Sequence, residues 1–528
     1  WKGASDQRRR PPGGDGLTGV HSVGDRLRGL RVAYARAQYE FHADSNRRRR
    51  EQTLGRPEGL GKVVSDVLER YRRSGHYATL TRVTPAAYDV SDSGERVLVA
   101  PKAVDVEFRP HRVAQGLVQR FRRGMGHGRR HWDHDAPIAQ DNYLGRKLRR
   151  VLARKGDTMD LGGTGLRPEH LPILKHLRVV DGASPDLYDG VFEPITFERF
   201  QACLRKTTKG TEPGLSGLTI DMLDAASDEI KADVVKLLNA ALAGRRVGFS
   251  SWLRRLLTPI PKVAGNPDVE MSRPIMLLEV LSKVFWAIIS ERVSAVLEEH
   301  RLLQPQQFGS RRGSSIIDAL TTLTLATEAA FEDRENLLAC LQDISKAYDS
   351  VARHIGKETS LRRLGMPEDL IEMFIQMDRG NAVSVATAFG NSADLLGPRE
   401  GSFEAIRGWS QGASESPLGW VIFYDVLLAV QNHPGNFEDP VLIPVGPDPA
   451  APAPGIVFVD DASWLSRSKR GMELRVNVAN LFFDFSGTQF NVKKTMCLAV
   501  EWMTGDGGTC TWDGVPPLGA SSEWAPHI

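Results

Sequence analysis

Three aspartates that follow short apolar runs constrain this chain more than any other feature. The run 336–342 ends at Asp343, and the run 456–459 leads into Asp460 and Asp461. Short apolar runs are typical of buried strands, so we expect Asp343 to lie where a strand leaves the core. Strand-forming residues resume after the second pair, which predicts a β-hairpin with two carboxylates at its turn.

Carboxylates on neighbouring strands suit phosphoryl transfer assisted by two metal ions. Two hard cations about 4 Å apart hold the attacking and leaving oxygens, and they take oxygen ligands from at least two carboxylates. An Asp-Asp pair considered alone is more often a turn or a helix cap. The aspartates by themselves therefore leave two interpretations open, a metal-dependent active site and an ordinary turn.

Charge is unevenly distributed along the 528 residues. Residues 1–150 contain 31 Lys and Arg against 17 Asp and Glu, whereas the remainder contains 37 against 48. A basic segment predicts contact with a polyanion, because each neutralised phosphate releases condensed counterions. A solvated tail is the alternative, since residues 1–60 lack periodicity and are expected to be a disordered basic arm. Residues 61–190 are also basic, and their pattern predicts no particular fold.

Several classes of protein are disfavoured by the composition. The sequence contains no run of 18 apolar residues, so a membrane span is not expected. Its four cysteines suggest a reducing compartment rather than a disulfide framework. His127, His131 and His134 form a cluster, but no Cys or His lies at the spacing of a zinc site.

Beyond residue 190 the sequence alternates between helical and strand patterns. Apolar residues at i, i+3 and i+4 predict a long amphipathic helix over 277–297. Ser416 and Pro417 predict the start of another helix, with Ser416 as its N-cap. Residues 433–454 are rich in Pro, Gly and Asp and are expected to form a surface loop. Further helices are predicted at 196–206, 220–243, 315–332 and 358–377, and a further strand at 256–262.

From residue 194 to 502 the chain resembles the reverse transcriptase family, and within it the non-LTR (LINE-type) retrotransposon branch. Segment 343–351 is similar to the first palm motif of that family, and 458–461 is similar to its metal-binding hairpin. Other similar segments follow in the family's order: 212–218, 259–262, 273–275, 307–309, 411–418 and 487–495. In the first of these, Ser216 replaces an expected Asp.

The resemblance implies an α+β right-hand polymerase fold, with a small antiparallel palm sheet backed by helices. Fingers and palm would occupy 191–502. Residues 503–528 would begin a truncated primer-grip and thumb region, so the thumb is expected to be largely absent and the chain to be part of a longer protein.

The resemblance also implies the metal ligands. Asp343, Asp460 and Asp461 would bind two Mg²⁺ ions, or Mn²⁺ in their place, and the carbonyl of Ile344 would be a further ligand. Lys494 would donate a proton to the departing pyrophosphate.

A second group of residues would bind the nucleotide. Lys262 and Arg273 would hold the triphosphate, because a point charge and a planar fork suit a polyanion. Tyr348 would stand where an aromatic ring collides with a ribose 2′-OH. Gln411 and Gly412 would lie against template and nucleotide, the glycine allowing a close backbone approach.

The implied activity is RNA-directed DNA synthesis from a primer 3′-OH on an RNA template, using dNTPs. Its DNA target would be nicked by an endonuclease domain elsewhere in the full protein, and the family implies a nuclear or cytoplasmic ribonucleoprotein. Two alternatives stay open: a group II intron-like or domesticated reverse transcriptase, and a catalytically inactive nucleic-acid-binding relic. An RNA-dependent RNA polymerase is disfavoured by Tyr348 and the finger motifs.

One departure from the family pattern affects the expected site. Ser414 and Glu415 stand where the family has Pro-Leu. Glu415 is therefore expected to add negative charge close to the nucleic-acid path and to weaken template handling.

Overall fold

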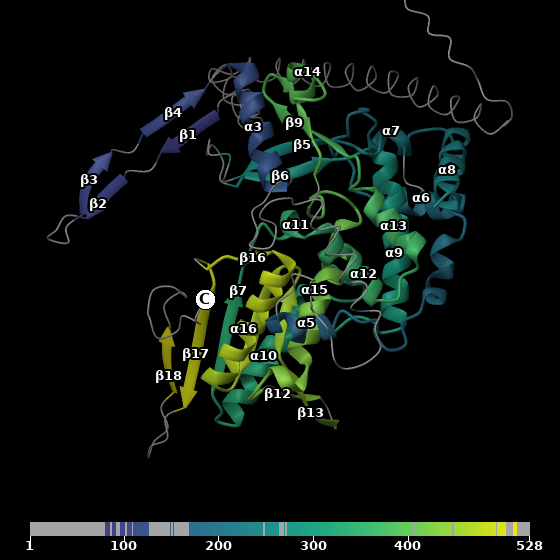
Figure 1. Ribbon diagram of the computed structural model, residues 1–528. Coiled ribbons are helices and arrows are strands. Elements are labelled where there is room, and N and C mark those ends of the chain that lie inside the picture. The colour runs from purple at the N-terminus through teal and green to yellow at the C-terminus, as the bar shows by residue number, and fades with distance from the viewer. Residues whose placement is uncertain are drawn as a thin grey trace, which may run out of the picture.

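The protein is represented by a computed structural model, in which two sheets with helices packed around them form the body (Figure 1). The basic arm 1–60 and the histidine cluster lie outside the described residues. Those residues are 80–84, 87–90, 96–100, 103–107, 109–125, 148, 152, 168–245, 249–262, 269, 272–405, 407–445, 448–492, 494–502 and 510–514.

The first sheet has five strands, and each is antiparallel to its neighbours. In spatial order they are β14 (Gly455–Phe458), β15 (Asp461–Ser466), β7 (Leu337–Gln342), β17 (Met496–Trp502) and β18 (Cys510–Gly514).

The second sheet is mixed, because β5 and β9 are parallel while the other pairs are antiparallel. Its strands are β10 (Gly390–Asn391), β9 (Ala382–Thr387), β5 (Arg254–Pro261) and β6 (Ser272–Leu277), with β11 (Ser402–Phe403) also paired to β9. Smaller pairs are β8 (Ile344–Ser345) with β16 (Gln489–Phe490), β12 (Val441–Val445) with β13 (Asp448–Ala453), β1 (Leu80–Thr84) with β4 (Ala103–Glu107), and β2 (Ala87–Val90) with β3 (Arg96–Ala100).

The helices of the described part are mostly those that the periodicity predicts. They are α3 (Pro110–Met125), α5 (Leu171–Lys175), α6 (Phe197–Lys206), α7 (Ile220–Asp224), α8 (Asp228–Ala243), α9 (Val280–Glu299), α10 (Ile316–Glu332), α11 (Ala347–Ser350), the π-helix η4 (Arg353–Glu358), α12 (Thr359–Arg363), α13 (Glu368–Gln376), α14 (Ser392–Leu396), α15 (Ser416–Asn432) and α16 (Lys469–Ser486), with short 3-10 turns η1 (Pro168–His170), η2 (Pro185–Phe192) and η5 (Pro434–Asn436).

Three local predictions were wrong. The helix predicted over 220–243 is two helices, because the Ser227 side chain accepts from the backbone N–H of Ile230 and starts a new one. The predicted loop over 433–454 contains the β12–β13 hairpin. Ser416 is the first residue of α15 rather than its N-cap, and its hydroxyl donates to the carbonyl of Ser410.

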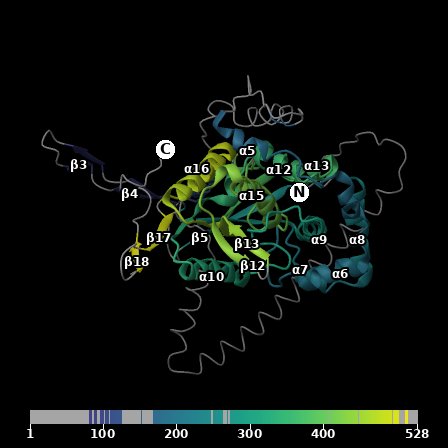
Figure 2. The ribbon, with the colours of Figure 1, turned by 90° about the horizontal axis from the view of Figure 1, so that it is seen from below.

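Both faces of the first sheet are covered. Successive residues of a strand point to opposite faces. Leu338 and Cys340 of β7 accordingly join the core formed with α15 and α16, whereas Leu337 and Ala339 pack with α10 and the β12–β13 hairpin. Figure 2 shows α16 and α10 on opposite sides of this sheet. The first sheet is thus a buried layer between helices.

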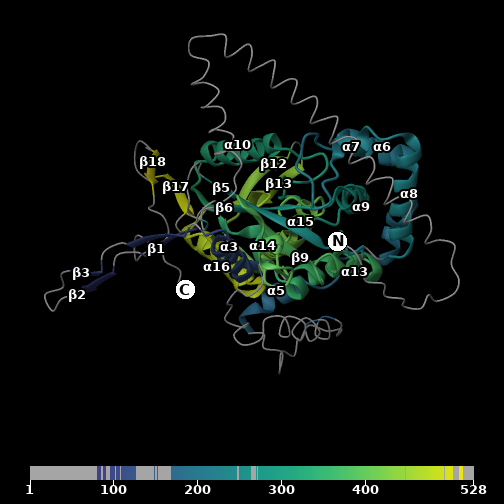
Figure 3. The ribbon, with the colours of Figure 1, turned by 90° about the horizontal axis from the view of Figure 1, so that it is seen from above.

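The second sheet is covered by the N-terminal helix α3. Val113, Leu117 and Phe121 of α3 pack in one apolar cluster with Leu257 of β5 and Val385 of β9. Figure 3 shows α3 beside α14 and β9. Residues upstream of the predicted boundary at 190/191 therefore share a core with residues downstream of it, and no break in packing coincides with that boundary.

No helix in the described part of the chain is both long enough and apolar enough to cross a membrane.

A buried ion pair joins α12 to α15. Arg363 Nη1 lies 2.5 Å from Asp425 Oδ2, and their side chains are 4% and 1% exposed. The other oxygen of Asp425 accepts from the backbone N–H of Gln304 at 2.6 Å, and Arg363 Nε donates to the carbonyl of His176 at 2.7 Å. Each charged group therefore has a further hydrogen-bond partner besides the other, which a buried ion pair requires.

Removal of one member of this pair is expected to destabilise the fold strongly. Asp425→Ala leaves the Arg363 guanidinium buried without its carboxylate and should lower the free energy of unfolding by about 3–5 kcal/mol. The exposed pair Arg379–Glu372 provides the control, and Glu372→Ala should cost less than about 1 kcal/mol. Urea denaturation of both variants measures the difference, and equal losses would contradict the prediction.

Candidate active site

The paired carboxylates stand at the turn between β14 and β15. Phe458 pairs with Asp461, so Val459 and Asp460 are the two turn residues. The φ angle of Val459 is +61°, a left-handed value that a β-branched side chain adopts only under constraint. A positive φ at the first turn position usually belongs to glycine. Conformations of this kind cost about 1–3 kcal/mol, and they persist where the surroundings impose them.

Three residues hold the turn in this conformation: Gln307, Trp420 and Gly309. The buried Gln307 amide accepts from the Val459 N–H at 2.8 Å and donates to the Val459 carbonyl at 3.0 Å. The indole of Trp420 donates to the same carbonyl at 2.7 Å. A Cβ on Gly309 would lie 2.4 Å from the Val459 nitrogen, so only glycine fits there. The segment 307–309, which the sequence singled out without a role, thus holds the hairpin in shape.

Asp343 lies at the same end of the first sheet. Gln342, the last residue of β7, pairs with Ala462 of β15, so the register carries Asp343 toward Asp461. Asn491 holds it in place, because its N–H donates to the Asp343 carbonyl at 2.7 Å and its side chain donates to Asp343 Oδ2 at 3.0 Å. The structure therefore brings the three predicted carboxylates to one sheet end.

Ile344 and Lys494, the other predicted members of this group, lie next to Asp343. The backbone of Ile344 pairs with Phe490 in the short β8–β16 ladder, which continues the path of β7 beyond the sheet. Lys494 Nζ lies 3.4 Å from Asp343 Oδ2 on a mostly exposed side chain. An ammonium at this position lies within reach of both the carboxylate and bulk water.

The electrostatics of the carboxylates favour a bound cation. Burial, and then the negative charge of Asp461, raise the pKa of Asp460, and Asp343 adds to the effect. Among the described residues, no group of three or more His, Cys, Asp or Glu side chains is placed to hold a metal ion by itself. Mg²⁺ does not require such a cage, since it commonly uses one or two carboxylates together with substrate phosphates and waters. The donor set therefore fits cations that are shared with a phosphate ligand.

Tyr348 stands between this sheet end and the helical core. Its ring is stacked on Trp420 at a centroid distance of 5.4 Å, and Trp420 is stacked in turn on Tyr424 at 5.6 Å. Burial, and then the charge of Asp460, raise the pKa of Tyr348 to about 12. The phenol is therefore neutral at physiological pH, and its ring is held in one orientation close to the carboxylates.

Three of the predicted nucleotide-binding residues line one cavity, which Ile344, Tyr348 and Gly412 do not line. Lys262, Arg273 and Gln411 lie on its wall, and the two cations come from the facing ends of β5 and β6. The Gln411 carbonyl accepts from the N–H of Met276 at 2.7 Å, which fastens this loop to β6. Gly412 has a φ of +103°, and a Cβ there would lie 2.7 Å from the Met276 carbonyl. Glycine is therefore required at position 412 because its backbone lies close to β6.

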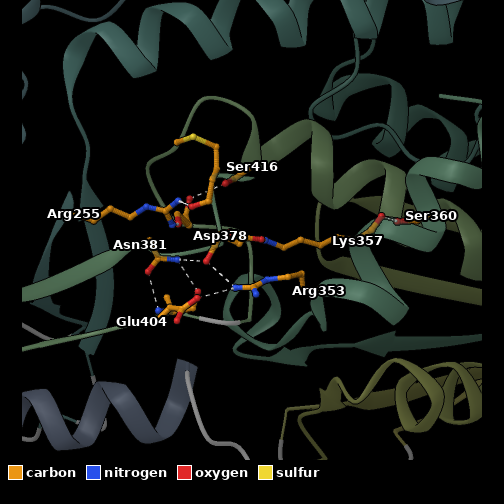
Figure 4. A network of polar contacts seen from close by, with 11 residues as sticks. Arg255, Arg353, Lys357, Ser360, Asp378, Asn381, Glu404 and Ser416 are labelled. Atoms are coloured by element: carbon orange, nitrogen blue, oxygen red, sulfur yellow. Dashed lines mark hydrogen bonds and ion pairs between the residues drawn. The ribbon is translucent and has the colours of Figure 1, made fainter. Parts of the chain in front are cut away.

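A network of buried charges supports the Gln411 loop (Figure 4). Lys357 Nζ lies 2.5 Å from Asp378 Oδ2, and the same ammonium lies 4.3 Å from the centre of the Trp409 ring. Arg255 donates to the carbonyl of Met377 and, at 2.6 Å, to the hydroxyl of Ser410. The network thereby links β5, the π-helix and the end of α13 to the residue that precedes Gln411.

Glu415 belongs to this network, which corrects the prediction made from the sequence. Its side chain is buried, at 6% exposure, among the charges of Arg255, Lys357 and Asp378, and does not add charge to an exposed nucleic-acid path. Burial raises the pKa of Glu415, while the nearby Arg255 and Lys357 oppose the shift. The residue that departs from the family pattern is therefore accommodated by buried cations.

The roles of some residues of the site could not be predicted from the sequence. Trp420 looked like one more apolar residue of α15, and its indole N–H partner at Val459 lies 39 residues away. Arg120 of α3 also lines the cavity with Lys262 and Arg273. A local pattern in the sequence does not predict such distant contacts. Asp349 could have been noticed, because a second acid in segment 343–351 is unexpected at a buried position.

Comparisons with known proteins find sequences that are similar to this region of the chain. The family model described as "Reverse transcriptase (RNA-dependent DNA polymerase)" matches residues 260–509. A probable RNA-directed DNA polymerase from transposon BS of Drosophila melanogaster is 30% identical over 33% of the chain and 19% of its own length. The corresponding protein from transposon X-element of the same organism is 24% identical, over 41% of the chain and 26% of its own length.

A third relative is the uncharacterized 149 kDa protein of transposon TX1 from Xenopus laevis, which is 28% identical over 30% of the chain and 12% of its own length. The chain thus matches about a quarter or less of the length of these relatives. The matched region contains the aspartates, the Gln307 clamp and the cavity cations Lys262 and Arg273. The resemblance predicted from the motifs is confirmed for residues 260–509, which match the reverse transcriptase family, and the similar proteins are those of transposons.

Proposed function

We propose that this chain carries the catalytic centre of an RNA-directed DNA polymerase, which extends a primer 3′-OH on an RNA template. The observation that carries the proposal is the meeting of Asp343, Asp460 and Asp461 at one end of an antiparallel sheet. Carboxylates at this spacing on neighbouring strands suit in-line phosphoryl transfer. In this proposal the first sheet is the palm and the second sheet belongs to the fingers.

The three aspartates would hold two divalent cations, with Mg²⁺ as the expected ion, Mn²⁺ as a substitute and the Ile344 carbonyl as a further ligand. When bound, such ions neutralise charge on the attacking and leaving oxygens. The chain itself contributes rigidity, because Asn491 fixes Asp343 and Gln307 fixes the turn that carries Asp460. Lys494, beside Asp343, is placed to donate a proton to the leaving group.

The cavity beside this sheet end would bind the incoming dNTP. Lys262 and Arg273 supply positive charge where the triphosphate would lie, and Gln411 closes the same wall. Tyr348, held against Trp420, would present its ring to the sugar and exclude a 2′-OH. The shared cavity of the cations and the stacking of Tyr348 support this proposal.

The biological setting follows from the transposon relatives. We propose that the activity serves retrotransposition, with an RNA template and a DNA primer or target. We further propose that an endonuclease domain lies elsewhere in the full protein and that the complex acts as a nuclear or cytoplasmic ribonucleoprotein. Fingers and palm would occupy 191–502, with the primer grip and thumb beginning at 503.

Loss of one carboxylate should abolish synthesis. Asp460→Asn is expected to lower the rate of dTTP incorporation on poly(rA)/oligo(dT) with Mg²⁺ by roughly a thousandfold, since several kcal/mol of transition-state stabilisation are removed and about 1.4 kcal/mol is tenfold. Asp333→Asn, at the exposed end of α10, is the matched control and should keep the wild-type rate. Full-length wild-type protein that extends no primer would refute the proposed activity.

The aromatic ring of Tyr348 should determine sugar selectivity. Tyr348→Ala removes the ring that would collide with a 2′-OH and is expected to raise ribonucleotide incorporation relative to deoxynucleotide by at least about tenfold. Tyr348→Phe keeps the ring on Trp420 and should discriminate as wild type does. The ratio of kcat/KM for UTP and dTTP measures the effect. An unchanged ratio in the alanine variant would remove this role.

The hydrogen bonds from Gln307 to the turn should determine how tightly the carboxylates bind metal. Gln307→Leu removes both hydrogen bonds to Val459 and lets the turn relax from its left-handed φ. The Mg²⁺ concentration for half-maximal primer extension should therefore rise several-fold, while the unfolding free energy falls by about 1–3 kcal/mol. A metal titration with circular dichroism as the folding control tests this. Wild-type Mg²⁺ dependence would contradict it.

A further inference from the structure

The cavity that contains Lys262 and Arg273 has a wall from outside the matched family region. Arg120, Phe121 and Met125 of α3 line it together with Lys262, residues of β6 and Gln411. Helix α3 ends more than a hundred residues before the family match begins at 260. The N-terminal part of the chain therefore takes part in the shape of this site.

Packing fixes the position of α3. Val113, Leu117, Val118 and Phe121 are buried at 4% exposure or less, and they fill the apolar cluster of the second sheet. Leu117, Val118 and Phe121 lie four, five and eight positions after Val113, so they form one stripe along the helix. Arg120 precedes Phe121 of that stripe, and its charge acts on Asp349 of α11, which α3 also contacts. Packing of the stripe therefore also fixes the backbone of Arg120.

Cationic side chains gather around the cavity. Among the described residues, four cations line it together with the carboxylate of Asp349; the cations are Arg120, Lys262, Arg273 and Lys346. The positive charges of Lys346, Arg120 and Lys262 all act on this buried carboxylate, so they stand close together. Like charges gathered around a cavity repel each other, and a bound anion relieves that repulsion.

We propose that Arg120 is a phosphate-binding residue of the nucleotide site, supplied by an N-terminal helix that lies outside the matched reverse transcriptase region. This inference rests on the proposed function and adds a residue to it. A guanidinium offers two parallel N–H donors to a phosphate, whereas an ammonium offers a point charge. Arg120 would complement Lys262 in this way from α3.

A nucleoside triphosphate suits this cavity better than a phosphate of the template backbone. A triphosphate concentrates its negative charge in one small volume, which matches a group of cations around a single cavity. A nucleic-acid backbone distributes its charge along the strand, at one per phosphate, and would need a groove rather than a cavity. The presence of Gln411, fastened to β6 beside the cations, also favours the nucleotide.

Steady-state single-nucleotide incorporation by the full-length protein tests the proposal. Arg120→Gln is expected to raise KM for dTTP by about tenfold, with kcat within about twofold and with unchanged affinity for poly(rA)/oligo(dT). Arg120→Lys should recover part of the affinity. The control is Arg112→Gln, an exposed arginine on the same helix that should leave all three quantities unchanged. An unchanged KM, or a loss confined to template affinity, would overturn the proposal.

A binding measurement separates this proposal from the proposed function. Calorimetric titration with inorganic tripolyphosphate requires no turnover, so it is informative even if the wild type extends no primer. Arg120→Gln should weaken tripolyphosphate binding about tenfold, and Arg112→Gln should not weaken it. Equal affinity of wild type and Arg120→Gln, with melting temperatures matched to show that both are folded, would refute the role of Arg120 whatever the outcome for synthesis.

Discussion

Strand β7 pairs with β15 on one side and with β17 on the other, and the site depends on this double pairing. The register with β15 brings Gln342 opposite Ala462, so the strand ends where β15 begins. A slip of one residue would exchange the two faces of β7 and would bury Leu337 where Leu338 now lies. Because both faces are covered by helices or by a hairpin, such a slip is strongly disfavoured. Asp343 therefore meets Asp460 and Asp461 as a consequence of core packing.

The unfavourable backbone conformation of Val459 is stabilised by residues that are distant in the sequence. Val459 has a backbone conformation that valine rarely adopts, and it is held there by Gln307, Gly309 and Trp420. None of these three residues is a neighbour of Val459 in the sequence. Strain at a turn is stable only when the surrounding structure imposes it. Gln307 and Gly309, before α10, and Trp420 of α15 thus fix the position of Asp460.

The same reasoning explains where prediction from the sequence succeeds. The apolar runs before Asp343 and Asp460 are local signals, and they predict both strands and the hairpin turn. Ser227 is also a local signal, because serine is a common N-cap. The apolar periodicity over 220–243 nevertheless led to a prediction of one helix where there are two. Glu415 was misplaced because its burial depends on Arg255 and Lys357, which lie on other elements. Long-range compensation of charge leaves no trace in a single sequence.

The boundary of the family match and the boundary of the folding unit are different properties. Family similarity begins at residue 260, and the matched range contains Lys262, Arg273 and the three aspartates. Packing begins earlier, since Val113, Leu117 and Phe121 bury the apolar faces of β5 and β9. Removal of α3 would expose those faces at a cost of about 25 cal/mol for each Å² of apolar surface. An active fragment should therefore need α3 for stability, even before any contribution of Arg120 to the nucleotide site is considered.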